Sequence, residues 1–480
     1  MRRALAVVSA VVALAAPAAA YAGFSPNDPL AQRQWYIEKD RVFDSFNSFS
    51  VLPQLLTVRV AVIDSGVDVS HPELKGRIVE ARSFVGGSAN DVQGHGTFVA
   101  GEIAALTDNG LGIAGLAPPA RLLVAKVVRD DGSIPPRAEA RAIRWAVRSG
   151  AKVINLSLGG TRDPSDPSVD GFSYEERRAI DYAVRTGALV VASVGNGEDA
   201  PSKPWRFASY PAALPHVLGV AAYGRSGGVP SFSNRDDVFV DITAPGQDML
   251  SLFPRSLTKA FPACQEQGYS SCGPKEYRHA DGTSFSSPQV AAAAALLFAL
   301  MPNLRPDQVS AILERAADDA SPADGCDACS PGRDELTGNG RLDVTAAIHS
   351  LRGQLPPSDR FEPNDDAGRE AQTVFRRALA AKATLDTWDD PNDVYRIHLR
   401  RGQGISVRVR SGSLDTSLVL WKPGLQALAL ATDELRARRS IHPEGVPERL
   451  VYRARTGGWY YVQVKLARPG SGQYAIRIAS

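Results

Sequence analysis

The chain has 480 residues, of which 44% are hydrophobic and 22% charged, and its 54 basic and 52 acidic side chains leave a formal net charge of +2. A chain of this length can bury one large hydrophobic core and support at least one further domain. Because the charges nearly balance, nothing in the composition demands a nucleic acid or a membrane surface as partner, and we expect neither.

The first 22 residues have the pattern of an export signal. Arg2 and Arg3 precede an apolar run over residues 4–16, and small residues follow, with cleavage expected after Ala20 or Ala22. A membrane anchor is the alternative, but the run is too short to span a bilayer comfortably. We therefore expect residues 1–22 to be a cleaved signal peptide and the protein to be secreted, to the extracellular space or the periplasm.

Within a first domain expected over residues 23–352, strand and helix patterns alternate from Val58 to about Ser350. Helical patterns over residues 138–149 and 174–186 are each followed by a glycine that can end a helix. Short apolar runs have the composition of buried parallel strands: residues 58–63, 120–128, 152–158, 188–194 and 217–222. This alternation predicts an α/β domain with a doubly wound, mostly parallel sheet, whose site lies at the carboxyl ends of the strands. Residues 291–300 are apolar but short, which favours a buried core helix over a membrane span.

A second domain is expected after a linker. Residues 353–366 carry Pro356, Pro357 and Pro363 among polar residues, which is typical of a linker. Beyond it, apolar and polar residues alternate with a period of two, as they do over residues 405–410, 460–464 and 474–478. That period predicts an antiparallel, all-β domain over residues 367–480.

Three short motifs place an acid, a histidine and a serine in sequence order. Asp64 comes just past the first predicted strand, while His95 and Ser284 each begin a predicted helix after glycine-containing segments. A serine hydroxyl needs a base to become nucleophilic, a neutral imidazole is a suitable base, and a buried carboxylate holds that imidazole in one tautomer. Each residue alone has a simpler explanation, as a cation ligand, a structural histidine or a helix N-cap. The order Asp, His, Ser is nevertheless that of the subtilisin class.

Residues 58–350 resemble the subtilase family of serine peptidases, and its thermitase-like members most of all. Residues 153–160 resemble the strand that pairs with substrate, and residues 190–196 resemble the segment that carries the oxyanion-hole asparagine. Further matching landmarks are residues 210–212, 231–233 and 244–246. The resemblance implies a subtilisin-like fold and a serine endopeptidase that hydrolyses peptide bonds through an acyl-enzyme intermediate.

The resemblance assigns a role to each matching residue. Ser284 would attack the scissile carbonyl, His95 would take its proton, and Asp64 would orient His95. Asn196 would donate to the oxyanion together with the backbone N–H of Ser284, although in isolation a Gly-Asn-Gly segment is typical of a turn. Six residues would bind an extended substrate or wall the pocket before the cut: Ser157, Leu158, Gly159, Ser193, Val194 and Gly195. Phe285 stands where the family usually has methionine, which should change the packing behind the nucleophile without displacing it.

A calcium site is also implied by the resemblance. Asp28, Glu73 and Asn109 match positions that supply oxygen ligands in thermitase-like relatives, and Leu111 would contribute its backbone carbonyl. Calcium binds six to eight oxygens, which such a loop can supply. The alternative is a solvated turn with ordinary surface acids.

The four cysteines form two close pairs. Cys264 and Cys272 flank a polar loop in a stretch, residues 253–279, that has the character of an insertion, and Cys326 and Cys329 form a C-x-x-C. In an exported chain, two local disulfides are the simplest interpretation. A zinc site would need four ligands, and a thioredoxin-like redox motif would need a strand-to-helix turn, so both are less favoured.

The C-terminal region resembles the bacterial pre-peptidase C-terminal domain, a small β-sandwich that is often removed during maturation. The resemblance lies in residues 359–365, 393–397 and 458–462. Residues 361–480 hold 19 basic and 13 acidic side chains, and Arg436, Arg438 and Arg439 could form a patch. An anionic surface is one possible partner of such a patch, and a solvated face is the alternative.

Together these features predict a secreted, monomeric endopeptidase that acts on proteins or peptides. A non-catalytic binding or scaffold protein with the same fold would be expected to have lost one of Asp64, His95 or Ser284, and all three are present. An esterase would be expected to carry its nucleophile in G-x-S-x-G, whereas Ser284 lies in Gly-Thr-Ser-Phe-Ser.

Overall fold

The computed structural model describes residues 23–47, 49–197, 200–258, 270–271 and 276–480. The expected signal peptide and the Cys264–Cys272 pair lie outside these residues. Seven parallel strands form the main sheet, in the order β2-β3-β1-β4-β5-β6-β7. Their bounds are β1 (Val58–Asp64), β2 (Ile78–Ser83), β3 (Ala120–Lys126), β4 (Val153–Leu156), β5 (Leu189–Ser193), β6 (Val217–Tyr223) and β7 (Ile242–Pro245).

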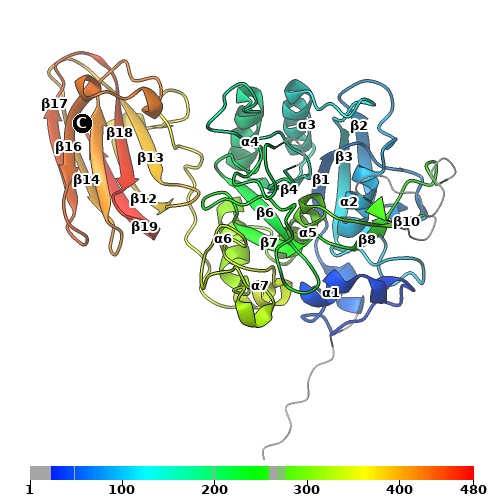
Figure 1. The fold of residues 1–480 in the computed structure, drawn as a ribbon. Helices are drawn as coiled ribbons and strands as arrows, with labels where there is room; N and C mark the ends of the chain where they lie inside the picture. The colour runs from blue at the N-terminus through cyan, green and yellow to red at the C-terminus, as the bar shows by residue number, and fades with distance from the viewer. Residues whose placement is uncertain (1–22, 48, 198–199, 259–269, 272–275) are drawn as a thin grey trace, which may run out of the picture.

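Helices cover both faces of this sheet, as the alternating pattern predicts (Figure 1). Alternate residues of β1 belong to two separate cores, with Val60 and Val62 in one and Ala61 and Ile63 in the other. The first core contains α2 and α5, and the second contains α3 and α4. The helices are α1 (Trp35–Lys39), α2 (His95–Ala104), α3 (Pro136–Arg148), α4 (Tyr174–Thr186), α5 (Ser287–Leu300), α6 (Pro306–Ala316) and α7 (Val344–Ser350).

The helix ends follow from local sequence. Helix α4 begins at the N-cap Ser173, whose hydroxyl accepts a hydrogen bond from the N–H of Glu176, and ends at Gly187, which has a φ of +94°. Residues Thr283–Leu300 are long and apolar enough to cross a membrane, but 89% of them are buried inside the protein. Its burial identifies this segment as part of the core, in agreement with the expectation for residues 291–300.

A small sheet lies beside the main one. It has the order β8-β10-β9, with β8 (Met249–Leu252) paired antiparallel to β10 (Tyr277–Ala280) and a short β9 (Ser270–Ser271). Helix α2 packs against β8 through Gly101, where an added Cβ would lie only 2.5 Å from Ser251 Oγ.

The C-terminal region forms two sheets around a shared apolar core, beside the α/β domain (Figure 1). All strand pairs are antiparallel except β11 with β13, which confirms the all-β prediction. The first sheet contains β11 (Gln372–Thr373), β13 (Asn392–Leu399), β18 (Gly458–Leu466), β15 (Thr416–Trp421) and β16 (Arg436–Ile441). The second contains β12 (Ala378–Asp386), β19 (Ser471–Ala479), β14 (Gly404–Arg410) and β17 (Glu448–Arg453).

Candidate active site

The carboxyl end of β1 and the start of α2 bring an acid and a histidine together. Asp64 is the last residue of β1 and is 1% exposed, and His95 is the first residue of α2. His95 Nδ1 lies 2.8 Å from Asp64 Oδ1, which also accepts a hydrogen bond from the N–H of Ser65. Because a carboxylate only accepts, this contact places the proton on Nδ1 and leaves Nε2 as the basic nitrogen.

The approach of His95 to Asp64 requires glycine on both sides. Gly94 has a φ of +101°, in the left-handed region that glycine adopts at little cost. A Cβ added to Gly96 would lie 2.1 Å from the backbone oxygen of Gly66 and 3.1 Å from Asp64 Oδ1. The two glycines therefore permit a contact that side chains would block.

Asp91, which the sequence analysis missed, holds the start of α2. Its Oδ1 accepts hydrogen bonds from Ser65 Oγ and from the N–H groups of Gln93 and Gly94, and its Oδ2 accepts from the N–H and Oγ1 of Thr97. These contacts satisfy N–H groups that a helix start leaves unpaired. An acid shortly before a helix is the signal that could have indicated this role.

Ser284 lies in a 3-10 turn, Thr283–Phe285, which precedes α5 instead of forming its first turn. Phe285 is 1% exposed, and its ring centroid lies 4.3 Å from that of Phe98 and 5.4 Å from that of His95. The phenylalanine therefore fills the space behind the imidazole, in line with the expected change in packing.

Asn196 is held by a residue next to Ser284. Its Oδ1 accepts hydrogen bonds from both the N–H and the Oγ1 of Thr283, each at 2.9 Å, and Thr283 Oγ1 in turn accepts from the N–H of Gly195. With Oδ1 so engaged, the Nδ2 donor of Asn196 is directed elsewhere, and Gly282 leaves room for it, since a Cβ there would lie 3.3 Å from Nδ2. The contact from Thr283 joins segments 87 residues apart, so no local pattern indicates it.

One cleft of about 360 Å³ is lined by Asp64, His95, Asn196 and Ser284. Five of the six predicted substrate residues also line it: Ser157, Leu158, Gly159, Ser193 and Gly195. The cleft has further lining residues that the sequence analysis did not single out: Gln93, Val128, Ile134, Thr161, Trp205, Ser209 and Asn234.

The assignment of Val194 to the wall of this cleft needs correction. Its side chain is fully buried in the core that contains α3 and α4. Its N–H donates to the oxygen of Val220, and its own oxygen accepts from Ser209 N and Asn234 Nδ2. Successive residues of an extended segment face opposite sides, so Ser193 and Gly195 face the cleft while Val194 faces away.

The three residues of the predicted calcium site are also brought together. Asp28 accepts hydrogen bonds from the N–H groups of Asp108 and Asn109, and Asn109 Nδ2 donates to Glu73 Oε2 at 3.0 Å. Burial raises the pKa of Glu73 to about 7 and raises that of Asp28 above its ordinary value. Gly112, with a φ of +41°, leaves space beside Glu73, because a Cβ there would lie 2.1 Å from Glu73 Oε1.

A second set of acidic groups that could hold a metal ion lies where the β domain begins. The carboxylates of Asp359, Glu362 and Asp393 are buried with ligand atoms within 4.8 Å of one another, and His216 forms a similar group with Glu362 and Asp365. Burial raises the pKa of Asp359, Glu362 and Asp393, because it penalises their charged forms.

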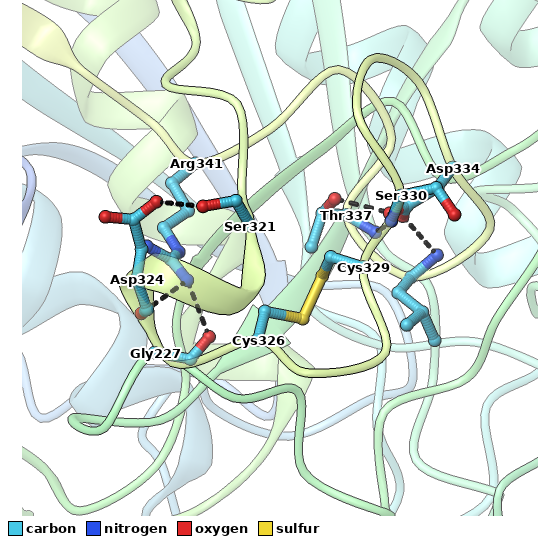
Figure 2. Close-up of a disulfide and its surroundings, with 10 residues drawn as sticks. Gly227, Ser321, Asp324, Cys326, Cys329, Ser330, Asp334, Thr337 and Arg341 are labelled. Atoms are coloured by element: carbon cyan, nitrogen blue, oxygen red, sulfur yellow. Dashed lines mark hydrogen bonds between the residues drawn. A yellow bond between two sulfur atoms is a disulfide. The ribbon is translucent and has the colours of Figure 1, made fainter.

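Cys326 and Cys329 are joined by a disulfide (Figure 2). Both are buried in a small apolar cluster with Ala320 and Leu336, between hydrogen-bonded turns that include the Ser321–Asp324 contact. The bond therefore closes a loop that has little apolar core of its own.

Comparisons with known proteins indicate the family of the chain. A model of the subtilase family matches residues 57–340, which is more than half of the chain. The chain is 36% identical over 336 residues to the cell wall-associated protease of Bacillus subtilis (strain 168), across 66% of this chain and 33% of that protein, so it spans about a third of that relative's length. It is 33% identical over 279 residues to thermitase of Thermoactinomyces vulgaris, across 57% of this chain and 85% of that protein. The crystal structure of a lanthipeptide protease superposes with a TM-score of 0.54 and 25% identity, across 68% of this chain and 99% of that one.

Proposed function

The chain belongs to the subtilase family, and from that premise we propose that it is a secreted serine endopeptidase in which Asp64, His95 and Ser284 form the catalytic triad. The observation that carries this proposal is the hydrogen bond between Asp64 and His95, at a cleft that Ser284 and Asn196 also line. Protein and peptide chains are the substrates, bound by a monomer.

In the proposed reaction, His95 Nε2 takes the proton of Ser284 Oγ as that oxygen attacks the scissile carbonyl. Asp64 keeps the other imidazole nitrogen protonated and stabilises the imidazolium that forms. His95 then gives its proton to the leaving amine, which leaves an acyl-enzyme on Ser284. Water activated by the same imidazole hydrolyses the acyl group and restores the serine.

The negative charge that develops on the carbonyl oxygen is stabilised best by hydrogen-bond donors that are already oriented toward it. Asn196 Nδ2 and the N–H of Ser284 fill that role, and the double contact from Thr283 keeps the Asn196 amide from rotating. Such donors are effective because they are already oriented, so little reorganisation accompanies the reaction.

Substrate binds as an extended strand along the backbone of Ser157, Leu158 and Gly159, while Ser193 and Gly195 line the pocket before the cut. The protein segment that binds the substrate is held in place by Asn155, which donates to Ser157 Oγ and accepts from Ser287 Oγ. These contacts link the substrate strand to α5, the helix that follows the nucleophile.

Calcium is proposed as a structural ion at Asp28, Glu73 and Asn109. The donor set is suitable, since two buried carboxylates and an amide offer only oxygen ligands once the Asn109 amide is turned to present Oδ1. The space that Gly112 leaves beside Glu73 also fits an ion there. A bound ion would replace the proton that the raised pKa of Glu73 favours.

Export, disulfide formation and the identity of the β domain are parts of the same proposal. Removal of residues 1–22 would release the protein into an oxidising compartment, where the Cys326–Cys329 bond is stable. The relative named for its association with the cell wall supports a location outside the cell. The β domain is proposed to be of the pre-peptidase C-terminal kind, joined through residues 353–366.

The experiment that tests the activity compares two serine variants of the purified protein. Ser284→Ala should abolish casein cleavage while its circular dichroism spectrum stays that of the native protein. Ser202→Ala, which removes an exposed hydroxyl from the same domain, should cleave casein at the native rate. Casein cleavage by the Ser284→Ala protein would refute the assignment.

A further inference from the structure

Three arginines lie side by side across the second sheet of the β domain. In the register of the antiparallel strands, Arg449 of β17 lies opposite Arg408 of β14, and Arg408 lies opposite Arg477 of β19. Residues directly opposite share one face, with Cβ atoms about 4.5–5.5 Å apart. The residues that alternate with them are buried in the core of the domain: Val407, Val409, Leu450, Ile476 and Ile478. The three arginines therefore point away from that core.

This row continues along the strands. Arg410 follows Arg408 on β14, and Arg453 follows Arg449 on β17, in both cases on the same face because side chains alternate along a strand. We call Arg408, Arg410, Arg449, Arg453 and Arg477 the arginine face. Strand β17 lies on the side of the β domain away from the α/β domain (Figure 1), so this part of the face is open to large partners.

The arginine face is not neutralised within the chain. Among the residues that the structure describes, none of its five guanidinium groups has an acidic partner within the 4.0 Å of an ion pair. Arg408 Nε is buried and also lacks a hydrogen-bond partner in the described part of the chain. Partial burial and the charges of Arg410, Arg449 and Arg477 lower the pKa of Arg408.

Such an arrangement costs stability, because like charges directly opposite each other on a sheet repel. Two half-buried arginines of the α/β domain do have acidic partners, Arg162 with Asp236 and Arg333 with Asp241, whereas the buried Arg77 donates to the backbone oxygen of Pro118. A binding partner that supplies negative charges would therefore explain why the chain keeps a row of arginines without acidic neighbours.

A hollow beside the face extends the basic surface. Its volume is about 680 Å³, and Arg401, Arg438, Arg453 and Arg455 line it together with Val451, which is 71% exposed. Arg438 belongs to the group that the sequence analysis singled out as a possible patch. The hollow lies next to Arg453, so an extended ligand can contact both regions.

We propose that the arginine face and its hollow bind an acidic polysaccharide, and so hold the protein at an anionic surface outside the cell. Carboxylate, sulfate and phosphate groups each match the planar fork of a guanidinium, and repeated groups along a chain match arginines repeated across strands. Single-stranded nucleic acid fits less well, because the aromatic side chain in the lining of the hollow, Tyr452, is half-buried against the core of the domain and offers no exposed ring on which bases stack. A membrane fits less well because Val451 is the only large apolar side chain exposed there in the described residues.

The test uses the full chain with Ser284→Ala, so that self-cleavage does not intervene, and heparin as the polyanion. The variant R408Q/R449Q/R477Q removes the row. The control R148Q/R178Q/R185Q removes the same charge from exposed positions on α3 and α4 that form no ion pair among the described residues. Dissociation constants are measured by titration calorimetry at several salt concentrations, with uncharged dextran as a blank.

We expect heparin to bind the parent protein and the control alike, and the row variant at least about tenfold more weakly at physiological salt, with a shallower dependence on salt. The melting temperature of the row variant without heparin should equal or exceed that of the parent, because repulsion has been removed. Equal weakening in row variant and control, no heparin binding by the parent, or tighter binding of poly(dT) or of phosphatidylglycerol vesicles than of heparin would each overturn the proposal.

Discussion

Replacement of Phe285 tests whether the aromatic ring behind the imidazole supports the site. Phe285 is almost fully buried and contacts both Phe98 and His95, so Phe285→Ala removes a ring that the surrounding core cannot easily replace. Phenylalanine-to-alanine changes in cores cost about 3–5 kcal/mol, whereas changes that conserve volume usually cost less than about 1.5 kcal/mol. We therefore expect Phe285→Ala to lower the melting temperature by at least about 6 °C, from about 2 °C per kcal/mol in a domain of this size, and Phe285→Met to lower it little.

Differential scanning calorimetry of the Ser284→Ala form measures the stability, and casein cleavage by the otherwise native form measures the activity. Phe285→Ala should also lower the turnover number, because His95 loses the ring against which it packs. Phe375→Ala is the matched control: Phe375 is 72% exposed, so the same chemical change should alter stability by less than about 0.5 kcal/mol. The reasoning fails if Phe285→Ala unfolds at the native temperature, or if Phe285→Met costs as much as alanine.

Three other substitutions probe the acid, the helix start and the ion site. Asp64→Asn should keep the fold but lower the turnover number by about 10³–10⁴, because the amide favours the wrong tautomer of His95. Steady-state kinetics with a peptide substrate measure the turnover number, and a loss of less than about tenfold would contradict the role of Asp64. Asp91→Ala should cost about 1–2 kcal/mol in thermal unfolding, since it removes the acceptor for the N–H groups that begin α2, and an unchanged melting temperature would contradict that role. Burial raises the pKa of Glu73 from 4.5 to about 7, so this carboxyl contributes stability at pH 4 that is lost as the pH rises through 7. In calorimetry with a chelator present, the native protein should therefore melt at a lower temperature at pH 8 than at pH 5, and added calcium should reverse the loss at pH 8. Glu73→Gln should weaken both responses. A native protein whose melting temperature does not change on addition of calcium would contradict the site.

The sequence predicts those strands and helices whose burial or ends leave a clear mark on neighbouring residues. Strand β1 is buried on both faces, so residues 58–63 form an uninterrupted apolar run. Helix α4 has both its ends marked, by the N-cap Ser173 and by Gly187. Strand β2 escaped prediction because it lies at the edge of the sheet, where most of its side chains are exposed and no apolar run is needed.

The residues of the site divide in the same way, into those that a local motif marks and those that no local motif marks. Asp64, His95 and Ser284 stand in recognisable motifs, so their sequence context suffices to select them. Thr283 acts through a contact between segments 87 residues apart, which no local periodicity reports. Asp91 acts mainly through nearby residues at the start of α2, and only its place before that helix could have indicated its role. Val194 was misplaced because a whole motif was assigned to the cleft, although successive residues of an extended segment face opposite sides.

The most direct test of the triad is to identify the residue that a serine-directed fluorophosphonate modifies. Peptide mapping by mass spectrometry of the inactivated protein should find one label per chain, on Ser284, and replacement of His95 by alanine should slow the labelling greatly because the hydroxyl loses its base. A protein that cleaves casein yet carries the label on another residue, or on none, would contradict the account.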